Sequence, residues 1–359
     1  MMTVSTSARG GAELGLAFFA VTALLFQPAG GAHEGERIAR HNVSLCRRRT
    51  RYSARPCSTT APCPELAARA TPRTTTSLPN ATTCVRWFAA QAANARAARL
   101  FGAARSTDDR PALMMVGDSI TEELAGTKMG WPAARSDGVP EALARILGHD
   151  FATLALGISG DQTQHLLWRL RHGEMSRALA TGPSAPASIV SVLIGTNNLA
   201  YGHSPTDVLD GIRAVADEVL AQSARALLAI NALLPRADGR KQARPSSSWF
   251  CPLRCGLAGA APRPLSLLVD EVNAGLPALV DALRAAHPRR TVRLVDCAKV
   301  LLDPAADGRA DAHGFAPVLE ALVPDLLHPN AAGFERILAC QRRAFAALML
   351  TREQLQASN

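Results

Sequence analysis

The sequence predicts an α/β protein in which a five-stranded parallel sheet lies between two helical layers, a three-layer α/β/α sandwich. Short apolar runs alternate with longer stretches of helical period along most of the chain. The runs are almost continuously apolar, which is typical of parallel strands buried on both faces. Apolar residues make up 48% of the 359 residues and charged residues 19%, so the chain can bury a sizeable core.

The predicted elements follow one another from residue 86 onward. A helix is expected over 86–105, with Trp87, Phe88, Leu100 and Phe101 as its apolar anchors. Strands are expected at 112–116, 151–156, 189–194, 226–230 and 292–295. Further helices are expected at 161–171, from Ser204-Pro205 to about Gln222, at 265–286 and at 331–350. Such alternation gives right-handed crossovers and places ligands at the carboxyl ends of the strands.

The first 84 residues divide into two segments that precede the regular pattern. Residues 1–32 contain a 13-residue apolar run, 14–26, followed by small residues, and are interpreted as a signal peptide or leader. An uncleaved membrane anchor and an organelle-targeting leader are the alternatives. Residues 33–84 are rich in Cys and Arg and are expected to be irregular. The α/β domain is expected over 85–359, with a surface-loop insertion at about 238–264.

The net charge of +9 is concentrated in that second segment. Residues 33–75 hold nine Arg and three Glu, including the run Arg47-Arg48-Arg49. A solvated tail explains this better than a nucleic-acid-binding arm, so no nucleic-acid partner is expected. Contact of this basic segment with a membrane surface is left open, and so is a homodimer.

The eight cysteines suit an oxidising compartment. Sequons for glycosylation begin at Asn42 and Asn80, which favours the secretory pathway or the extracellular space. The pairing of the cysteines cannot be deduced from spacing. Cys251 and Cys255 lack a second ligand pair at zinc spacing, so a local disulfide or two free thiols is expected there. No metal and no cofactor is expected.

Four polar segments stand where the chemistry of such a sheet is expected. Three follow predicted strands: Gly-Asp-Ser-Ile-Thr at 117–121, Gly-Ile-Ser-Gly-Asp at 157–161 and Gly-Thr-Asn-Asn at 195–198. The fourth, Asp-Leu-Leu-His-Pro-Asn at 325–330, precedes the last helix. Each alone is a common turn or cap. Together they supply a hydroxyl, a base with an acid three positions away, and candidate oxyanion donors.

These four segments resemble, in chain order, the sequence blocks of the SGNH, or GDSL, hydrolase superfamily. The stretch 157–170, together with 195–198 and Leu-Leu-Pro-Arg at 233–236, is similar to the catalytic subunits of intracellular platelet-activating-factor acetylhydrolase. The resemblance covers roughly residues 85–350. It implies a flavodoxin-like SGNH hydrolase fold and an esterase acting on short-chain, acetyl esters. Those relatives are cytosolic, lack a leader and commonly carry Gly where this chain has Ser159.

The resemblance assigns a role to each residue of the expected site. Ser119 is the expected nucleophile, His328 the base and Asp325 the acid that orients it. The oxyanion hole is expected from the N–H groups of Ser119 and Gly160 and the side-chain amide of Asn197. The partner is then a small-molecule ester, either a lipid or an acetylated sugar. A carbohydrate O-acetylesterase and a catalytically silent binding module of the same fold are the alternatives.

Neighbouring polar residues have simpler interpretations. Asp118 and Asp161 precede predicted helices and are expected to cap helices or brace loops. Trp168 and Arg169 are expected to pack and to form pairs on their helix. The pattern Gly-x-Ser-x-Gly is absent from the sequence, which argues against the α/β-hydrolase fold.

Overall fold

The computed structural model describes residues 45–46, 65–74, 78, 80–105, 108–175, 188–223, 225–238, 264–306, 310–311 and 314–357. The expected leader at 1–32 and all but the ends of the expected loop insertion at 238–264 lie outside these residues. So do Cys57, Cys63, Cys251, Cys255 and the sequon at Asn42.

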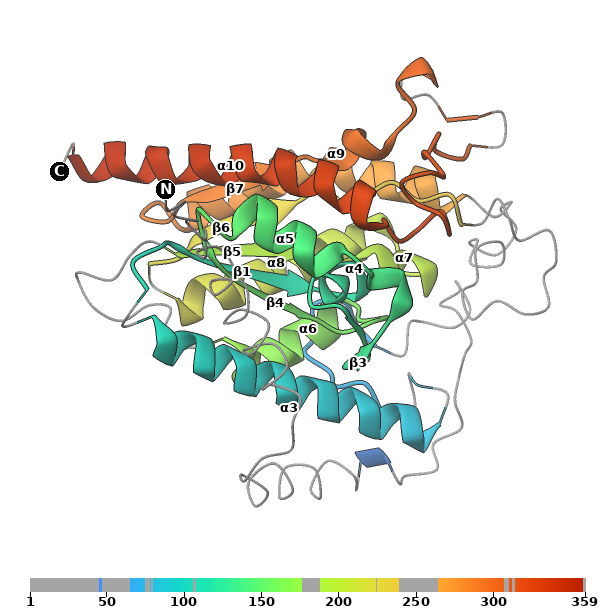
Figure 1. Ribbon diagram of the computed structural model, residues 1–359, viewed down its shortest axis with the longest axis horizontal. Helices are drawn as coiled ribbons and strands as arrows, with labels where there is room; N and C mark the ends of the chain where they lie inside the picture. Colours follow the sequence, from blue (N-terminus) through green and yellow to red (C-terminus); the bar gives the residue numbers. More distant parts are fainter. Residues whose placement is uncertain are drawn as a thin grey trace, which may run out of the picture.

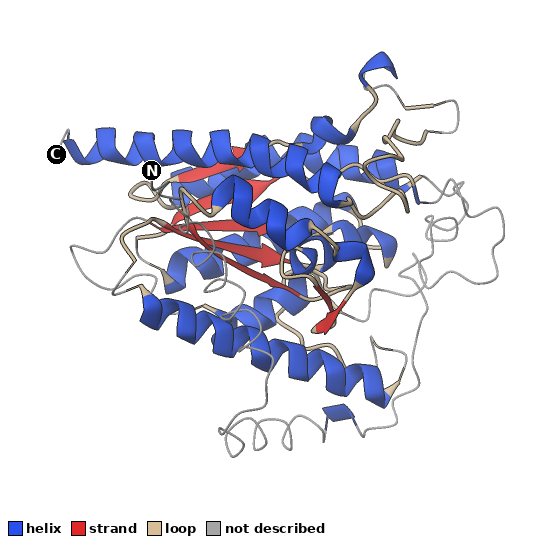
Figure 2. Ribbon diagram, viewed as in Figure 1, coloured by secondary structure: helices blue, strands red, loops and turns tan. Residues whose placement is uncertain are grey.

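A five-stranded, all-parallel sheet forms the centre of the molecule (Figures 1 and 2). Its strands are β1 (Ala112–Gly117), β4 (Ala152–Gly157), β5 (Ser188–Leu193), β6 (Leu227–Asn231) and β7 (Val292–Val295). They are arranged in the order β4-β1-β5-β6-β7. In chain order of the sheet strands this is the 2-1-3-4-5 arrangement of flavodoxin-like folds, as predicted.

Helices cover both faces of the sheet, which confirms the predicted three layers (Figure 1). One face packs against α3 (Ala81–Ala104), α6 (Thr163–Arg169), α8 (Pro205–Gln222) and α9 (Leu265–Ala286). The other packs against α5 (Val139–Leu147) and α10 (Ala331–Ala357). Successive residues of β1 serve both cores, because side chains of a strand alternate between faces. Met114 and Val116 join the first core, and Leu113 and Met115 the second.

Short elements connect the main strands and helices. They are α4 (Ser119–Glu123), α7 (Thr196–Ala200), the hairpin β2 (Thr127–Lys128) and β3 (Trp131–Pro132), a π-helical turn at Leu170–Glu174, and 3₁₀ turns at Ala134–Ser136, Ala298–Leu301 and Pro304–Ala306. None of these, nor α5, was predicted, because segments of this length carry too few turns to show a period.

The predicted helix boundaries differ from the observed ones at three places. The first helix begins at Ala81 rather than 86, because Asn80 is its N-cap and its Oδ1 accepts a hydrogen bond from the Thr83 N–H, 2.9 Å away. The helix expected over 161–171 ends at Arg169, where the chain passes into the π turn that contains Gly173 at φ 101°. The last helix continues to Ala357.

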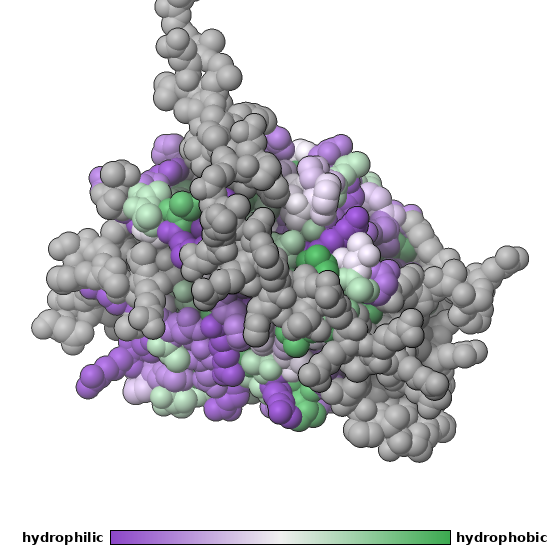
Figure 3. All heavy atoms as spheres, turned by 90° about the horizontal axis from the view of Figure 1, so that it is seen from below, coloured by the Kyte–Doolittle hydropathy of each residue, from purple (hydrophilic) through white to green (hydrophobic). Residues whose placement is uncertain are grey.

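Two disulfides join described residues. Cys46 is bonded to Cys84 in the first turn of α3, and Cys297, just after β7, is bonded to Cys340 in α10. Among the described helices, none is both long and apolar enough to cross a membrane. Figure 3 views the molecule from the side of α3. The exposed residues of this helix include Arg86, Arg96 and Arg99.

Candidate active site

Ser119 lies where β1 ends and α4 begins. The carboxylate of Asp118 caps this helix, with Oδ1 accepting a hydrogen bond from the Ile120 N–H at 3.1 Å. Gly157 at the end of β4 allows α4 to approach, since a Cβ there would stand 2.2 Å from the Glu122 nitrogen. The Ser119 side chain is thereby fixed at the carboxyl edge of the sheet, where the sequence predicted chemistry to lie.

The structure brings the three expected triad residues into one hydrogen-bonded chain. Ser119 Oγ lies 3.0 Å from His328 Nε2, and His328 Nδ1 lies 2.7 Å from Asp325 Oδ2. The carboxylate next to Nδ1 favours the tautomer with its proton on Nδ1, which leaves Nε2 as an acceptor facing the serine hydroxyl. This arrangement is able to remove a proton from Ser119.

The loop between β7 and α10 holds the acid and the base together. Asp325 Oδ1 accepts hydrogen bonds from the backbone N–H groups of Leu327 and His328, at 3.0 and 2.6 Å. Leu326 adopts φ 63°, an unfavourable conformation for a branched side chain, and its own side chain is fully buried. Burial of Leu326 therefore stabilises a strained turn that places Asp325 and His328 on the same side.

The electrostatic environment lowers the pKa values of both His328 and Asp325. Burial lowers the pKa of His328, and the Arg135 and Arg236 charges act in the same direction against the Asp325 carboxylate. Burial by itself would raise the pKa of Asp325, but its hydrogen bonds from His328 hold that pKa well below its usual range. At neutral pH the imidazole is therefore neutral and the carboxylate ionised.

Gly160 lies at the tip of the turn that follows β4. Its φ of +82° is a backbone conformation that glycine adopts without strain. Within the same turn, Glu122 Oε2 accepts hydrogen bonds from both the N–H and the Oγ of Ser159, each 2.6 Å long. The hydroxyl of Ser159, the residue at which this chain departs from its expected relatives, therefore braces the turn against α4.

Asn197 reaches the same edge from α7 but does not present a free amide. Its Nδ2 donates hydrogen bonds to the backbone oxygen of Asp161, at 2.9 Å, and to Asp118 Oδ2, at 3.2 Å. Asn197 therefore links the residue before Ser119 with the residue after Gly160. To donate to an oxyanion, the Asn197 side chain has to turn so that the N–H now bonded to Asp118 Oδ2 points to the oxyanion instead.

Asn198 has a separate structural task. Its Oδ1 accepts a hydrogen bond from the Thr163 N–H at 2.9 Å, and its Nδ2 donates to Thr163 Oγ1 and Gln164 Oε1. These bonds hold the first turn of α6, and Asn198 is fully buried. The two adjacent asparagines thus have different partners.

The bracing expected of Asp161 and Arg169 is present. Asp161 is fully buried, accepts a hydrogen bond from Trp87 Nε1 at 2.7 Å and pairs with Arg169 Nε at 2.8 Å. Arg169 also pairs with Glu174 at 2.5 Å. Trp168 packs between Trp87 and the stacked ring of His172.

Several polar residues near the site were not predicted from the sequence. Glu122 and Glu123 are buried next to the nucleophile, and Glu123 pairs with Arg135. Arg236, 1% exposed, donates to the backbone oxygen of Thr196 at 3.0 Å and so fixes the turn before Asn197. Arg73 contacts the Gly160 turn from far along the chain. Only Arg236 had a sequence signal, the Leu-Leu-Pro-Arg stretch.

Among the described residues no group of three or more His, Cys, Asp or Glu side chains is placed to hold a metal ion.

Comparison with known proteins places the chain in a family. Residues 115–336 match the sequence profile of the GDSL-like Lipase/Acylhydrolase family. The chain is 30% identical to the platelet-activating factor acetylhydrolase IB subunit alpha1 of Bos taurus over 186 residues, which is 52% of this chain and 59% of that protein. Against the Pongo abelii subunit the identity is 29%, covering 61% of this chain and 77% of the other.

Solved structures also align with the chain. A member of the lipolytic protein G-D-S-L family from Veillonella parvula aligns with a TM-score of 0.38 and 18% identity, covering 65% of this chain and 97% of the other. A family 3 carbohydrate esterase from Clostridium thermocellum aligns with a TM-score of 0.41 and 15% identity, covering 67% and 98%.

The matched profile spans more than half of the chain and includes both the Gly-Asp-Ser turn and the Asp325–His328 loop. The chain therefore belongs to the GDSL-like lipase/acylhydrolase family.

Proposed function

We propose that this protein hydrolyses short-chain carboxylic esters, acetyl esters above all, through a Ser119–His328–Asp325 triad and an acyl-serine intermediate. The observation that carries the proposal is the 3.0 Å separation of Ser119 Oγ and His328 Nε2, with Asp325 on the far side of the ring. A nucleophile, its base and the orienting acid within hydrogen-bond reach are the geometric signature of acyl transfer.

The mechanism assigns one task to each group. His328 Nε2 accepts the Ser119 proton as Oγ attacks the ester carbonyl, and then donates it to the departing alcohol. Asp325 stabilises the imidazolium. The N–H groups of Ser119 and Gly160 and the Asn197 amide bind the oxyanion. Water, activated by the same imidazole, releases the acid and restores Ser119.

Exposure of the site supports a substrate that approaches from solvent. The Asp325 side chain is 53% exposed and that of His328 14% exposed, whereas Ser119 lies deeper. An acyl group can therefore reach the nucleophile while the alcohol part of the ester remains outside.

Labelling by a fluorophosphonate tests the nucleophile directly. Wild-type protein should be labelled at Ser119 and should hydrolyse p-nitrophenyl acetate, and Ser119→Ala should do neither while melting within a few degrees of wild type. Wild-type protein that takes no label and hydrolyses no ester would instead indicate the silent binding module.

The alcohol part of the substrate is decided by a second series. Matched rates on acetylated phospholipids and O-acetylated sugars should identify the preferred class, because the acyl group is the same in both. The name of the Bos taurus relative points to a lipid ester, and the name of the Clostridium thermocellum structure points to carbohydrate esters. The secretory route rests on the cysteine pairs, and membrane contact and a homodimer stay predictions.

A further inference from the structure

Residues 65–74, which we call the N-terminal strap, lie against the start of α6. Glu65 Oε2 is 2.8 Å from His165 Nε2 and accepts a hydrogen bond from Gln164 Nε2 at 3.1 Å. Thr163 Oγ1 donates to the Ala67 oxygen at 2.8 Å, and the Thr71 N–H donates to the Gln164 oxygen at 3.1 Å. The strap is thus fixed to the helix that directly follows the Gly160 turn.

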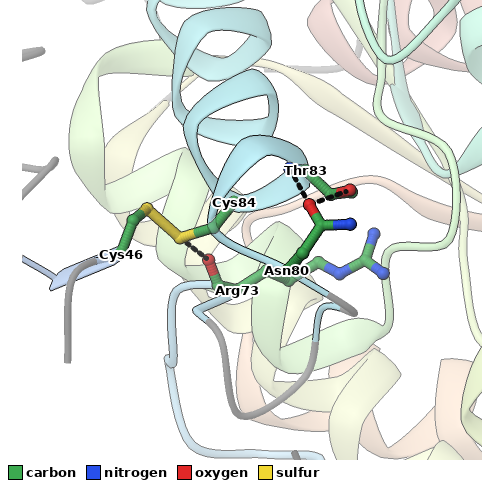
Figure 4. Close-up of a disulfide and its surroundings, with 5 residues drawn as sticks. All are labelled: Cys46, Arg73, Asn80, Thr83 and Cys84. Atoms are coloured by element: carbon green, nitrogen blue, oxygen red, sulfur yellow. Dashed lines mark hydrogen bonds between the residues drawn. A yellow bond between two sulfur atoms is a disulfide. The ribbon is translucent and has the colours of Figure 1, made fainter. Parts of the chain in front are cut away.

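The strap delivers Arg73 into the candidate site. Arg73 is 5% exposed although it belongs to a segment with no regular secondary structure. Its carbonyl oxygen lies 3.8 Å from Cys84 Sγ, half of the disulfide to Cys46, and Figure 4 shows its side chain extending away from that disulfide. The Arg73 backbone therefore lies between the Cys46–Cys84 disulfide and the contacts of the strap with α6.

The guanidinium of Arg73 contacts the peptide that carries the candidate oxyanion donor. Nη1 donates a hydrogen bond of 2.8 Å to the Ser159 carbonyl oxygen. That carbonyl and the N–H of Gly160 belong to the same planar peptide group. A positive charge at the oxygen end fixes the plane and polarises the bond, so the N–H at the other end becomes a better donor.

The space around Gly160 agrees with this contact. A Cβ built on Gly160 would stand 2.9 Å from Arg73 Nη1 and 3.1 Å from Nη2. The guanidinium therefore lies directly against the glycine. On the other side, Glu122 holds the preceding peptide through the Ser159 N–H. The Glu122 carboxyl group therefore fixes one peptide of the Gly160 turn, and the Arg73 guanidinium fixes the next.

Neutralising Asp161 does not account for Arg73. The two side chains are 3.5 Å apart, but Asp161 already has Arg169 at 2.8 Å and Trp87 Nε1 at 2.7 Å. The shorter contact of Arg73 is with the carbonyl, not with the carboxylate.

We propose that Arg73 is a positioning residue of the oxyanion hole, which orients and polarises the Ser159–Gly160 peptide so that the Gly160 N–H is presented to the developing oxyanion. The proposal rests on the proposed esterase function. Through Arg73, the N-terminal strap then contributes to stabilisation of the transition state.

The test compares Arg73→Met, Arg73→Lys and the control Arg69→Met, in the full chain with its disulfides intact. Arg69 belongs to the same strap but is exposed. Losing an oxyanion donor outright costs roughly 10²–10³ in kcat, so losing its positioning residue should cost about 10- to 100-fold. KM should change by less than about threefold, because the ground-state carbonyl makes a weaker contact than the oxyanion. Arg73→Lys should recover part of the loss, and Arg69→Met should match wild type.

A trifluoromethyl ketone gives a readout that a merely structural role would not move. Its adduct with a serine nucleophile carries an oxyanion, so its affinity should fall in Arg73→Met by about the same factor as kcat/KM. Arg73→Met that melts lower but keeps wild-type kcat and ketone affinity would overturn the proposal while leaving the esterase function standing. Wild type that hydrolyses no ester would instead remove the proposed function.

Discussion

His328 is surrounded by charges of both signs, and in the proposed mechanism its protonation sets the pH range of activity. Asp325 favours the imidazolium, whereas burial and the charges of Arg135 and Arg236 disfavour it and lower the pKa of His328. The base must be neutral to accept the Ser119 proton. The balance of these effects therefore appears directly in the pH dependence of kcat/KM.

The profile of kcat/KM should rise with pH and reach its plateau through a midpoint below 6.5, the ordinary value for histidine. In Asp325→Asn the favourable partner is lost, so kcat should fall by about 10⁴-fold because the tautomer is no longer fixed. Initial rates on p-nitrophenyl acetate, corrected for spontaneous hydrolysis, measure both. A midpoint above 7 in wild type would contradict the electrostatic account of the site.

The adjacent asparagines should separate kinetics from stability. Asn197→Ala removes a candidate oxyanion donor, so kcat should fall roughly 10²–10³-fold with KM nearly unchanged. Asn198→Ala leaves buried groups at the start of α6 without partners, which should cost about 1–3 kcal/mol of stability with a smaller effect on kcat. Thermal melts and steady-state rates on both variants decide the matter. Equal kcat in Asn197→Ala and wild type would assign Asn197 to bracing alone.

At the scale of elements, α10 is fixed to the sheet by more than its apolar face. Phe334, Ile337 and Leu338 pack into the second core, and Cys340 is bonded to Cys297 beyond β7. The loop that carries Asp325 and His328 lies in the chain between Cys297 and Cys340. The disulfide thus limits how far the end of the sheet and the last helix separate when the chain unfolds.

The double variant Cys297→Ala/Cys340→Ala should lose about 2–4 kcal/mol of unfolding free energy, because the bridge closes a loop with a sequence separation of 43. Urea denaturation monitored by tryptophan fluorescence measures the change. Either single variant should lose a similar amount, since the bridge is the shared feature. The kcat of the folded fraction should stay at the wild-type value, and a large loss of kcat without loss of stability would give the disulfide a different role.

Across the whole molecule, the buried carboxyl groups make the free energy of unfolding fall as pH rises between about 4 and 8. Burial raises the pKa of Asp118 and of Glu174 to about 7 and that of Glu123 to about 8. The folded state keeps these protons at pH values where the unfolded chain, with pKa values near 4, has lost them. Their contribution is therefore full below about pH 4 and is lost as pH rises through 7 to 8.

Glu123→Gln should flatten this decline. Between pH 5 and 8 the unfolding free energy of wild type should fall more steeply than that of Glu123→Gln, by at most one proton, or about 1.4 kcal/mol per pH unit. Denaturant titrations at pH 5, 6, 7 and 8 give the slopes. Glu141→Gln, at an exposed position of α5, is the matched control and should follow wild type. Identical slopes in all three proteins would show that Glu123 is ionised in the folded state throughout.

The sequence by itself determined the layers, the strands and the positions of the expected site residues. All five strands appear within a residue or two of their predicted places, because buried parallel strands are apolar on both faces and stand out from amphipathic helices. The polar turns after β1, β4 and β5 could be placed together because parallel strands end at one edge of a sheet. The catalytic roles of Ser119, Asp325 and His328 stay predictions, which the geometry supports.

Only the tertiary structure decided which distant groups meet. The pairing of Cys46 with Cys84, the two acceptors of the Asn197 amide and the contact of Arg73 with the Ser159 carbonyl join residues that are 36 to 86 positions apart. Local patterns encode periodicity and turn chemistry, whereas a partner across the fold is chosen by how the finished layers pack. Arg73 lies in a segment without hydrophobic periodicity, so the residues around it in the sequence do not indicate which peptide it contacts.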